Sequence, residues 1–208
     1  MQKEIVCFGD SNTYGLVPGQ KERYPRDIRW TGLLESSLCH KGYHVIEEGL
    51  CGRTTVFEDA LRDHRKGSDM LPAILECHKP IDLIILMLGT NDCKSYYHAS
   101  ADVIGLGIEK LLEQIRSQLQ NVRILLISPI HLGNDVWKEE FDPEFDIDSV
   151  KVSKELKKVY HNIAVRYEID FLAASEHASA SEADQQHLNE TGHRNLAEAI
   201  LRKLNTEE

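Results

Sequence analysis

The sequence predicts an α/β protein, a three-layer α/β/α sandwich built around a five-stranded parallel sheet. Short apolar runs, typical of buried strands, alternate five times with segments whose apolar residues recur at helical spacing. The best of these runs are apolar on both faces, as expected for parallel strands that are covered by helices on both sides. Right-handed crossovers between such strands place the helices in two outer layers.

Five segments are expected as strands. The segment 81–88 reads Ile-Asp-Leu-Ile-Ile-Leu-Met-Leu, and this long apolar run makes it the best candidate for a central strand. The full set of expected strands is 3–9, 43–48, 81–88, 122–128 and 168–172.

Helices are expected between the strands and after the last one. Apolar residues lie three or four apart in the most clearly amphipathic segments. No repeat, low-complexity tract or linker divides the chain, so we expect residues 1–208 to form a single domain. The expected helices are 28–40, 69–79, 101–119, 150–167 and 189–204.

Composition limits the classes of partner. The chain of 208 residues has a formal net charge of −10, which argues against nucleic acid or an anionic membrane surface, because both need a positive footprint. No stretch approaches the roughly 20 apolar residues of a membrane span. The first strand follows Met1 almost at once and leaves no room for a signal peptide, so we expect a cytoplasmic protein.

The cysteines indicate reduced thiols. The chain has 5 of them, with no CxxC or Cys/His ligand spacing. Cys7, Cys77 and Cys93 lie in or near apolar segments. We therefore expect most of the thiols to act as small apolar fillers.

Two long connections interrupt the alternation, at 12–27 and 131–148. Connections of this length in a compact domain are often functional. The second carries Trp137, Phe141 and Phe145 among acidic residues. It is interpreted as a lid, as a subunit contact, or as a surface loop that tucks its aromatic side chains onto the core.

Ser11 follows the first strand at the point where the chain must turn. In open α/β sheets, ligands bind beyond the carboxyl ends of the strands, so a serine at this point is a candidate nucleophile. The alternative is that Asp10, Ser11 and Asn12 form an ordinary polar turn and helix cap, because all three residue types favour such places.

The neighbouring strand ends favour the functional interpretation. Loops after parallel strands share one edge of the sheet, so their polar side chains converge there. A serine, a histidine, an acid and amide donors on one edge form a candidate acyl-transfer site. After the first strand comes Ser11, after the second Gly52, after the third Asn91 and Asp92, and after the fifth Asp184 and His187.

Each expected role meets a chemical need. A serine hydroxyl is a poor nucleophile until a base takes its proton, and His187 is the candidate base. Asp184 would hold the tautomer of that histidine and stabilise the imidazolium. The tetrahedral intermediate needs preorganised donors, for which the backbone N–H groups of Ser11 and Gly52 and the side-chain amide of Asn91 are candidates.

Four blocks of the chain resemble, in order and spacing, those of the SGNH (GDSL-type) hydrolase family. They are Gly9-Asp10-Ser11, Gly52, Gly89-Thr90-Asn91-Asp92 and Asp184-Gln185-Gln186-His187. Within this family the chain looks most like the small bacterial arylesterase/acyltransferase group. That likeness includes the segments Arg29-Trp30-Thr31-Gly32 and Arg53-Thr54-Thr55.

The resemblance implies a flavodoxin-like sheet and a catalytic triad of Ser11, Asp184 and His187. It also implies an oxyanion hole made by Ser11, Gly52 and Asn91, and chemistry that needs no metal and no cofactor. Relatives of this group form oligomers, so the resemblance implies a homo-oligomer.

Two residues depart from the family pattern. Asn12 follows the nucleophile where the family name has leucine, but members differ at this position, and we still expect activity. Tyr14 stands where relatives with marked acyltransferase activity carry tryptophan. This second departure bears on acyl transfer to alcohols more than on hydrolysis.

Supporting roles are expected for further residues near the strand ends. We expect Asp10 and Asp92 to brace their loops by hydrogen bonds. Arg53 is expected either to hold the glycine loop in place or to contact substrate. His131 is a candidate for the substrate pocket, and His193 is expected to be a solvated or capping residue.

These observations predict a serine esterase. The expected substrate is a small-molecule ester with a short acyl group, such as acetyl, on an aryl, alkyl or sugar alcohol, and the acyl-serine could also transfer its acyl group to an alcohol. Alternatives in the same family are a lysophospholipase and a thioesterase. Alternatives of another class are a metal-dependent phosphoesterase, for which the chain lacks paired histidine ligands, and a non-catalytic binding protein on a hydrolase scaffold.

Overall fold

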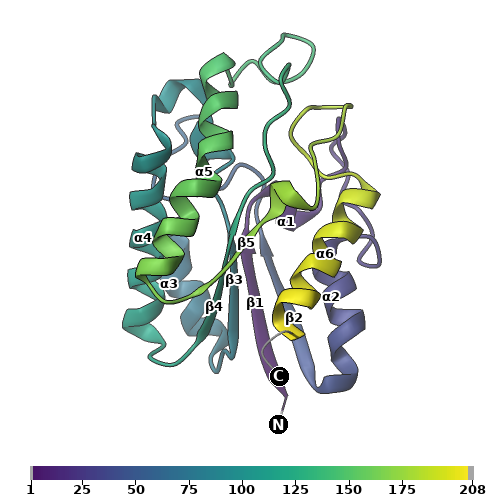
Figure 1. Cartoon of the computed structure of the whole chain (residues 1–208), viewed down its shortest axis with the longest axis vertical. Coiled ribbons are helices and arrows are strands. Elements are labelled where there is room, and N and C mark those ends of the chain that lie inside the picture. The colour runs from purple at the N-terminus through teal and green to yellow at the C-terminus, as the bar shows by residue number, and fades with distance from the viewer. Residues whose placement is uncertain (1, 206–208) are drawn as a thin grey trace.

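The computed structural model describes residues 2–205, and these contain one five-stranded sheet (Figure 1). The strand order is β2-β1-β3-β4-β5, and every neighbouring pair is parallel. This is the flavodoxin-like order of a doubly wound α/β fold. The strands are β1 (Lys3–Gly9), β2 (Tyr43–Gly49), β3 (Leu83–Met87), β4 (Arg123–Ser128) and β5 (Asp170–Ala173).

Helices cover both faces of the sheet, which confirms the predicted three layers. Helices α3, α4 and α5 lie on one face, and α2 and α6 lie on the other (Figure 1). The short helix α1 lies at the carboxyl edge of the sheet. The helices are α1 (Ser11–Tyr14), α2 (Trp30–Leu38), α3 (Gly67–His78), α4 (Ala101–Gln118), α5 (Ile147–Arg166) and α6 (Glu190–Asn205).

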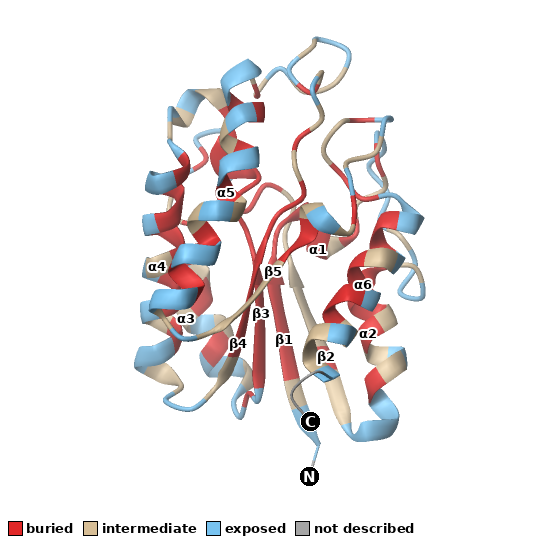
Figure 2. Cartoon of the chain, viewed as in Figure 1, coloured by how far each residue is buried: buried red, intermediate tan, exposed pale blue. Residues whose placement is uncertain are grey.

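The core is divided by the pleat of the strands. Val6 and Phe8 of β1 pack toward α3, α4 and α5, whereas Ile5 and Cys7 pack toward α2 and α6. Successive side chains of a strand point to opposite faces, so a strand that is apolar throughout contributes side chains to the cores on both faces of the sheet. Figure 2 shows the result as buried central strands, β1, β3 and β4, between helices that turn exposed residues outward, whereas the edge strands β2 and β5 are mostly of intermediate burial.

Several element boundaries differ from prediction by a few residues, and two of the differences have a clear local reason. The connection 12–27 begins as helix α1, because Asp10 caps it and Gly15 ends it with a left-handed φ of 82°. The last strand begins at Asp170 rather than at Glu168. Glu168 has a φ of 49° and turns the chain out of α5, which places it in the turn rather than in the sheet.

The cysteines do not behave alike. Cys7 and Cys93 are buried, as expected of apolar fillers, but Cys39 and Cys77 are exposed and Cys51 is half-buried. The prediction that most of them fill the core was therefore wrong. Cys77 lies near apolar residues in the sequence, yet it faces outward near the end of α3.

The order of the strands places the site. β1 and β3 are neighbours at the sheet's topological switch point, where the chain leaves β1 toward one side and β3 toward the other, and ligands of such sheets bind there. Ser11 follows β1 and Asn91 follows β3. Among the helices of residues 2–205, none is long and apolar enough to cross a membrane.

Candidate active site

Ser11 is held at the first position of helix α1. The carboxylate of Asp10 accepts a hydrogen bond from the backbone N–H of Asn12 at 2.9 Å and so caps the helix. This is the bracing contact expected of Asp10, and burial raises the pKa of its carboxyl group. Gly9 is required before the turn, because a Cβ there would lie 2.0 Å from the Thr13 hydroxyl oxygen.

The predicted serine, histidine and acid meet in space. The distance from Ser11 Oγ to His187 Nε2 is 2.9 Å, and that from His187 Nδ1 to Asp184 Oδ2 is 2.7 Å. A carboxylate only accepts hydrogen bonds, so Nδ1 carries the proton and Nε2 faces the hydroxyl as an acceptor. All three residues are buried. The fold brings Ser11 and His187 into contact across 176 positions of sequence.

Asp184 is saturated with hydrogen-bond donors. Its Oδ1 accepts from the backbone N–H groups of Gln186 at 3.1 Å and His187 at 3.0 Å. Its Oδ2 accepts from His187 Nδ1 and from the backbone N–H of Gly19 at 2.8 Å. Burial alone would raise the pKa of this carboxyl group, but the hydrogen bonds and the charge of His187 outweigh it and lower the pKa.

Asn12 clamps the histidine loop from the other side. Its Oδ1 accepts from the backbone N–H of Leu188 at 2.9 Å, and its Nδ2 donates to the carbonyl of Gln186 at 3.2 Å. These two contacts flank His187 in the sequence. The residue next to the candidate nucleophile therefore fixes the backbone that carries the candidate base.

The two loops expected to form an oxyanion hole are bonded to each other. Asn91 Nδ2 donates to the carbonyl of Arg53, the neighbour of Gly52, at 3.1 Å. An amide nitrogen has two N–H donors, so one of them remains for a ligand. Gly52 has a φ of 82°, a left-handed conformation that glycine adopts without strain.

The side chains of Arg53 and Asp92 hold these two loops in place by hydrogen bonds. Nη1 of Arg53 donates to the carbonyls of Gly9, at 2.9 Å, and of Glu48, and burial lowers the pKa of the guanidinium to about 10. Asp92 accepts from the backbone N–H of Thr55 at 2.9 Å and from the Thr55 hydroxyl. Burial raises the pKa of Asp92 to about 6. Both side chains make the contacts expected of braces.

Tyr14 and His131 lie outside this hydrogen-bonded group. The Arg23 guanidinium lies 4.4 Å above the centre of the half-buried Tyr14 ring. Within residues 2–205, no hydrogen bond or ion pair joins His131 to Ser11, Asp184 or His187, and its Nε2 is buried with no partner. The role of His131 in a substrate pocket stays a prediction.

His193 was expected to be solvated or to cap a helix; it is not solvated, and it contacts the first residue of α2. Its side chain is fully buried, and its Nδ1 accepts a hydrogen bond from the backbone N–H of Trp30 at 3.3 Å. Burial, with the nearby charges of Arg29 and His187, lowers the pKa of His193 to about 4. Because α6 packs against α2, this histidine enters the interior instead of facing solvent.

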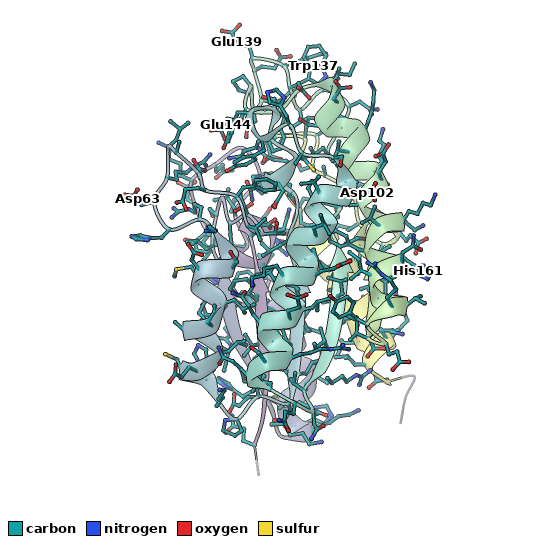
Figure 3. The ribbon with its side chains drawn as sticks, turned by 90° about the vertical axis from the view of Figure 1, so that its left-hand side faces the viewer. Asp63, Asp102, Trp137, Glu139, Glu144 and His161 are labelled. Carbon is teal, nitrogen blue, oxygen red and sulfur yellow. The ribbon has the colours of Figure 1, made fainter. Side chains whose placement is uncertain are left out.

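The connection between β4 and α5 tucks one of its aromatic side chains onto the core and leaves another partly exposed, and its roles as a lid or a subunit contact stay predictions. Phe145 is buried in the core, whereas Trp137 is 39% exposed. Figure 3 shows Trp137 and Glu139 at the outer end of the molecule. Further along, Glu144 Oε2 contacts Arg62 Nη2 and Lys94 Nζ at 2.6 Å each, which ties the connection to the loops after β2 and β3.

A family model matches this arrangement of loops across most of the chain. The GDSL-like lipase/acylhydrolase family model covers residues 7–194. The chain belongs to this family. It is therefore a carboxylic ester hydrolase of the SGNH type, as its four sequence blocks predicted.

Solved structures of relatives cover nearly all of this GDSL-family chain. Est24, a carbohydrate acetylesterase from Sinorhizobium meliloti, is 34% identical, with a TM-score of 0.90 and 100% of both chains covered. The aryl esterase of M. smegmatis is 32% identical, with a TM-score of 0.88, and the match covers 98% of this chain and 99% of that one. A comparison with curated proteins found no match.

Two contacts in this GDSL-type site were not predicted from the sequence. One is the bond from Gly19 to Asp184, and the other is the Asn12 clamp. For Gly19, the only available signal was its place in an unusually long connection. For Asn12, it was a polar residue where the family name has leucine.

Proposed function

We propose that Ser11 is the nucleophile of this esterase, His187 its general base and Asp184 the acid that orients the base. The observation that carries the proposal is the continuous chain of contacts from Ser11 Oγ through His187 to Asp184, at 2.9 and 2.7 Å. A nucleophile within hydrogen-bond reach of a base that is oriented by a third group is the arrangement acyl transfer needs.

The proposed reaction has two halves. Ser11 Oγ attacks the ester carbonyl carbon while its proton passes to His187 Nε2, and the tetrahedral oxyanion accepts hydrogen bonds from Gly52, Asn91 and the Ser11 backbone. The imidazolium then gives that proton to the leaving alcohol, and the acyl-serine remains. In the second half, His187 takes a proton from water, the resulting hydroxide equivalent attacks the acyl carbon, and the carboxylic acid leaves as Ser11 regains its proton.

The proposed substrates carry a short acyl group, acetyl first, on an aryl, alkyl or sugar alcohol. Two relatives support this class, since one is named a carbohydrate acetylesterase and another an aryl esterase. Transfer of the acyl group to an alcohol in place of water uses the same acyl-serine, and we propose it as a secondary activity.

The test is hydrolysis of p-nitrophenyl acetate, followed by a panel of acyl lengths and acetylated sugars. Ser11→Ala and His187→Ala should each lower kcat/KM by at least about 10³. Exposed residues of the same types supply matched controls, and Ser179→Ala and His161→Ala should keep wild-type rates. Full activity in Ser11→Ala would overturn the proposal, and a preference for long acyl chains or thioesters would replace the substrate class.

A further inference from the structure

A small hairpin, residues 15–24, fills part of the long connection between α1 and α2. Leu16 pairs with Arg23 in an antiparallel bridge, and the backbone N–H of Val17 donates to the carbonyl of Glu22 at 2.9 Å. The tip, residues 19–22, is exposed to solvent. Backbone hydrogen bonds within the hairpin therefore hold its two arms together.

The tip of this hairpin nevertheless contacts the buried acid of the site. The backbone N–H of Gly19 donates to Asp184 Oδ2 at 2.8 Å. The same oxygen accepts from His187 Nδ1 at 2.7 Å. Gly19 has a φ of 70°, a left-handed conformation that glycine adopts without strain.

The base of the hairpin is bonded to the helix that carries Ser11. Arg23 Nε donates to the carbonyl of Tyr14 at 2.6 Å, and its guanidinium lies over the Tyr14 ring. Arg23 Nη2 also contacts Glu47 Oε2 at 3.3 Å. One short element thus links the end of the nucleophile helix to the carboxylate behind the histidine.

We propose that the 15–24 hairpin is a positioning element for the Asp184–His187 pair and that the Gly19 N–H is the group through which it acts. The proposal rests on the proposed function, because it assumes that this pair serves Ser11. Gly19 touches neither substrate nor reacting atoms and is a positioning residue.

The N–H has two physical effects on the pair. A carboxylate oxygen has two lone-pair directions, and Gly19 and His187 occupy both of those on Oδ2, so the carboxylate plane cannot rotate away from the imidazole. The donor also draws negative charge away from Oδ2. With the Gly19 N–H in place, the carboxylate therefore stabilises the imidazolium less than it would without it.

Other titratable groups face the same pair. The charge of Asp10 interacts with His187, as does that of His193 from α6, and Asp184 interacts with Tyr24 at the end of the hairpin. Glu190, at the start of α6, acts on Tyr24 as well. A decisive experiment must leave all of these groups unchanged while it removes one N–H.

Replacing the Gly19 amide by an ester meets that requirement. A synthetic peptide of residues 1–38 with glycolic acid in place of Gly19 can be joined as a thioester to Cys39 of residues 39–208. The matched control is the same ligated chain with Gly19 itself. Both are refolded and compared by near-ultraviolet circular dichroism, by kcat and KM on p-nitrophenyl acetate, and by the pH dependence of kcat/KM.

We expect the ester-containing protein to lose about tenfold in kcat with little change in KM. The acid limb of its pH profile should move to higher pH, because the carboxylate with one donor fewer holds the proton on His187 more tightly. Unchanged kcat and an unchanged acid limb in a folded ester protein would overturn the proposal.

A second variant covers the case in which the ester protein does not refold. Two glycines in place of residues 17–22 would close the hairpin with a two-residue turn and remove the Gly19 donor. The same shift of the acid limb would support the proposal, and a wild-type profile would overturn it. Lys21→Ala, at the exposed tip, is the control and should leave both rate and profile unchanged.

These outcomes are separable from failure of the proposed function. If Ser11→Ala kept full activity, the pair would not serve Ser11 at all. If Ser11→Ala were inactive and the ester protein behaved like its control, only the positioning role of Gly19 would fall.

Discussion

Asn12 Oδ1 accepts a hydrogen bond from the backbone N–H of Leu188 at 2.9 Å, across 176 positions of sequence. The same side chain donates to the carbonyl of Gln186, so the amide spans both sides of His187. Leucine at this position, as in the family name, could make neither bond. Here the nucleophile and its base are therefore joined twice, once through the hydroxyl and once through the neighbouring amide.

Asn12→Leu should lower both activity and stability. It leaves the Leu188 N–H and the Gln186 carbonyl without their side-chain partner, at a cost of about 1–3 kcal/mol in unfolding free energy. It also frees the histidine loop, so we expect kcat to fall by at least about tenfold. Urea unfolding and p-nitrophenyl acetate kinetics measure the two effects.

Asn12→Asp is the matched comparison for that variant. It keeps an oxygen for the Leu188 N–H, but it places a second acceptor oxygen against the Gln186 carbonyl and brings a negative charge into a buried site. Its losses at neutral pH should therefore be at least as large as those of Asn12→Leu. Wild-type kcat in a folded Asn12→Leu protein would show that the clamp does not position the base.

His193 should make the protein less stable in mild acid. Its pKa is about 4 in the folded protein against about 6.5 in an unfolded chain, so the unfolded state binds more protons between these values. The contribution of the neutral histidine is complete above pH 6.5 and is lost progressively as the pH falls toward 4. Between pH 7.5 and 5 we expect this loss to be about 2 kcal/mol.

His193→Asn isolates that contribution. Asparagine can place an oxygen near the Trp30 N–H that His193 Nδ1 now accepts from, but it does not titrate. Urea unfolding at pH 7.5 and 5 should therefore show a smaller acid loss in the variant than in wild type. Equal losses would mean that His193 is protonated as easily in the folded chain as in the unfolded one.

Thr55→Val should destabilise the protein in a pH-dependent way. The change removes the hydroxyl that donates to the buried Asp92 and leaves the backbone N–H donor in place. The charged carboxylate needs that donor more than the neutral acid does, so the pKa of Asp92 should rise further above its present value of about 6.

The measurable consequence lies in the difference between two pH values. At pH 8 the folded variant must keep Asp92 charged with fewer donors, and we expect a loss of about 1–3 kcal/mol in unfolding free energy. At pH 5 Asp92 is largely neutral, and the loss should be smaller. In an Asp92→Asn background the effect of Thr55→Val should become independent of pH.

Most of the fold could be predicted because its determinants are local. The apolar runs and the helical spacing of apolar residues fix where strands and helices form, and they place the strand-end loops on one edge. Ser11, Asp184 and His187 could be predicted for the same reason, since each lies in a segment that follows the end of a strand. The errors arose where one residue had to be assigned to the surface or the interior, as for Cys77 and His193.

The sequence by itself determined the α/β layers, the edge of the sheet at which the candidate catalytic residues lie, and the residue types available there. Only the tertiary structure decided which backbone groups complete the site. The Gly19 N–H and the Asn12 amide act on residues more than 160 positions away. Hydrogen bonds of this kind depend on where two loops lie after the layers have packed, and a backbone N–H, present in every residue except proline, leaves no mark of its function in the sequence.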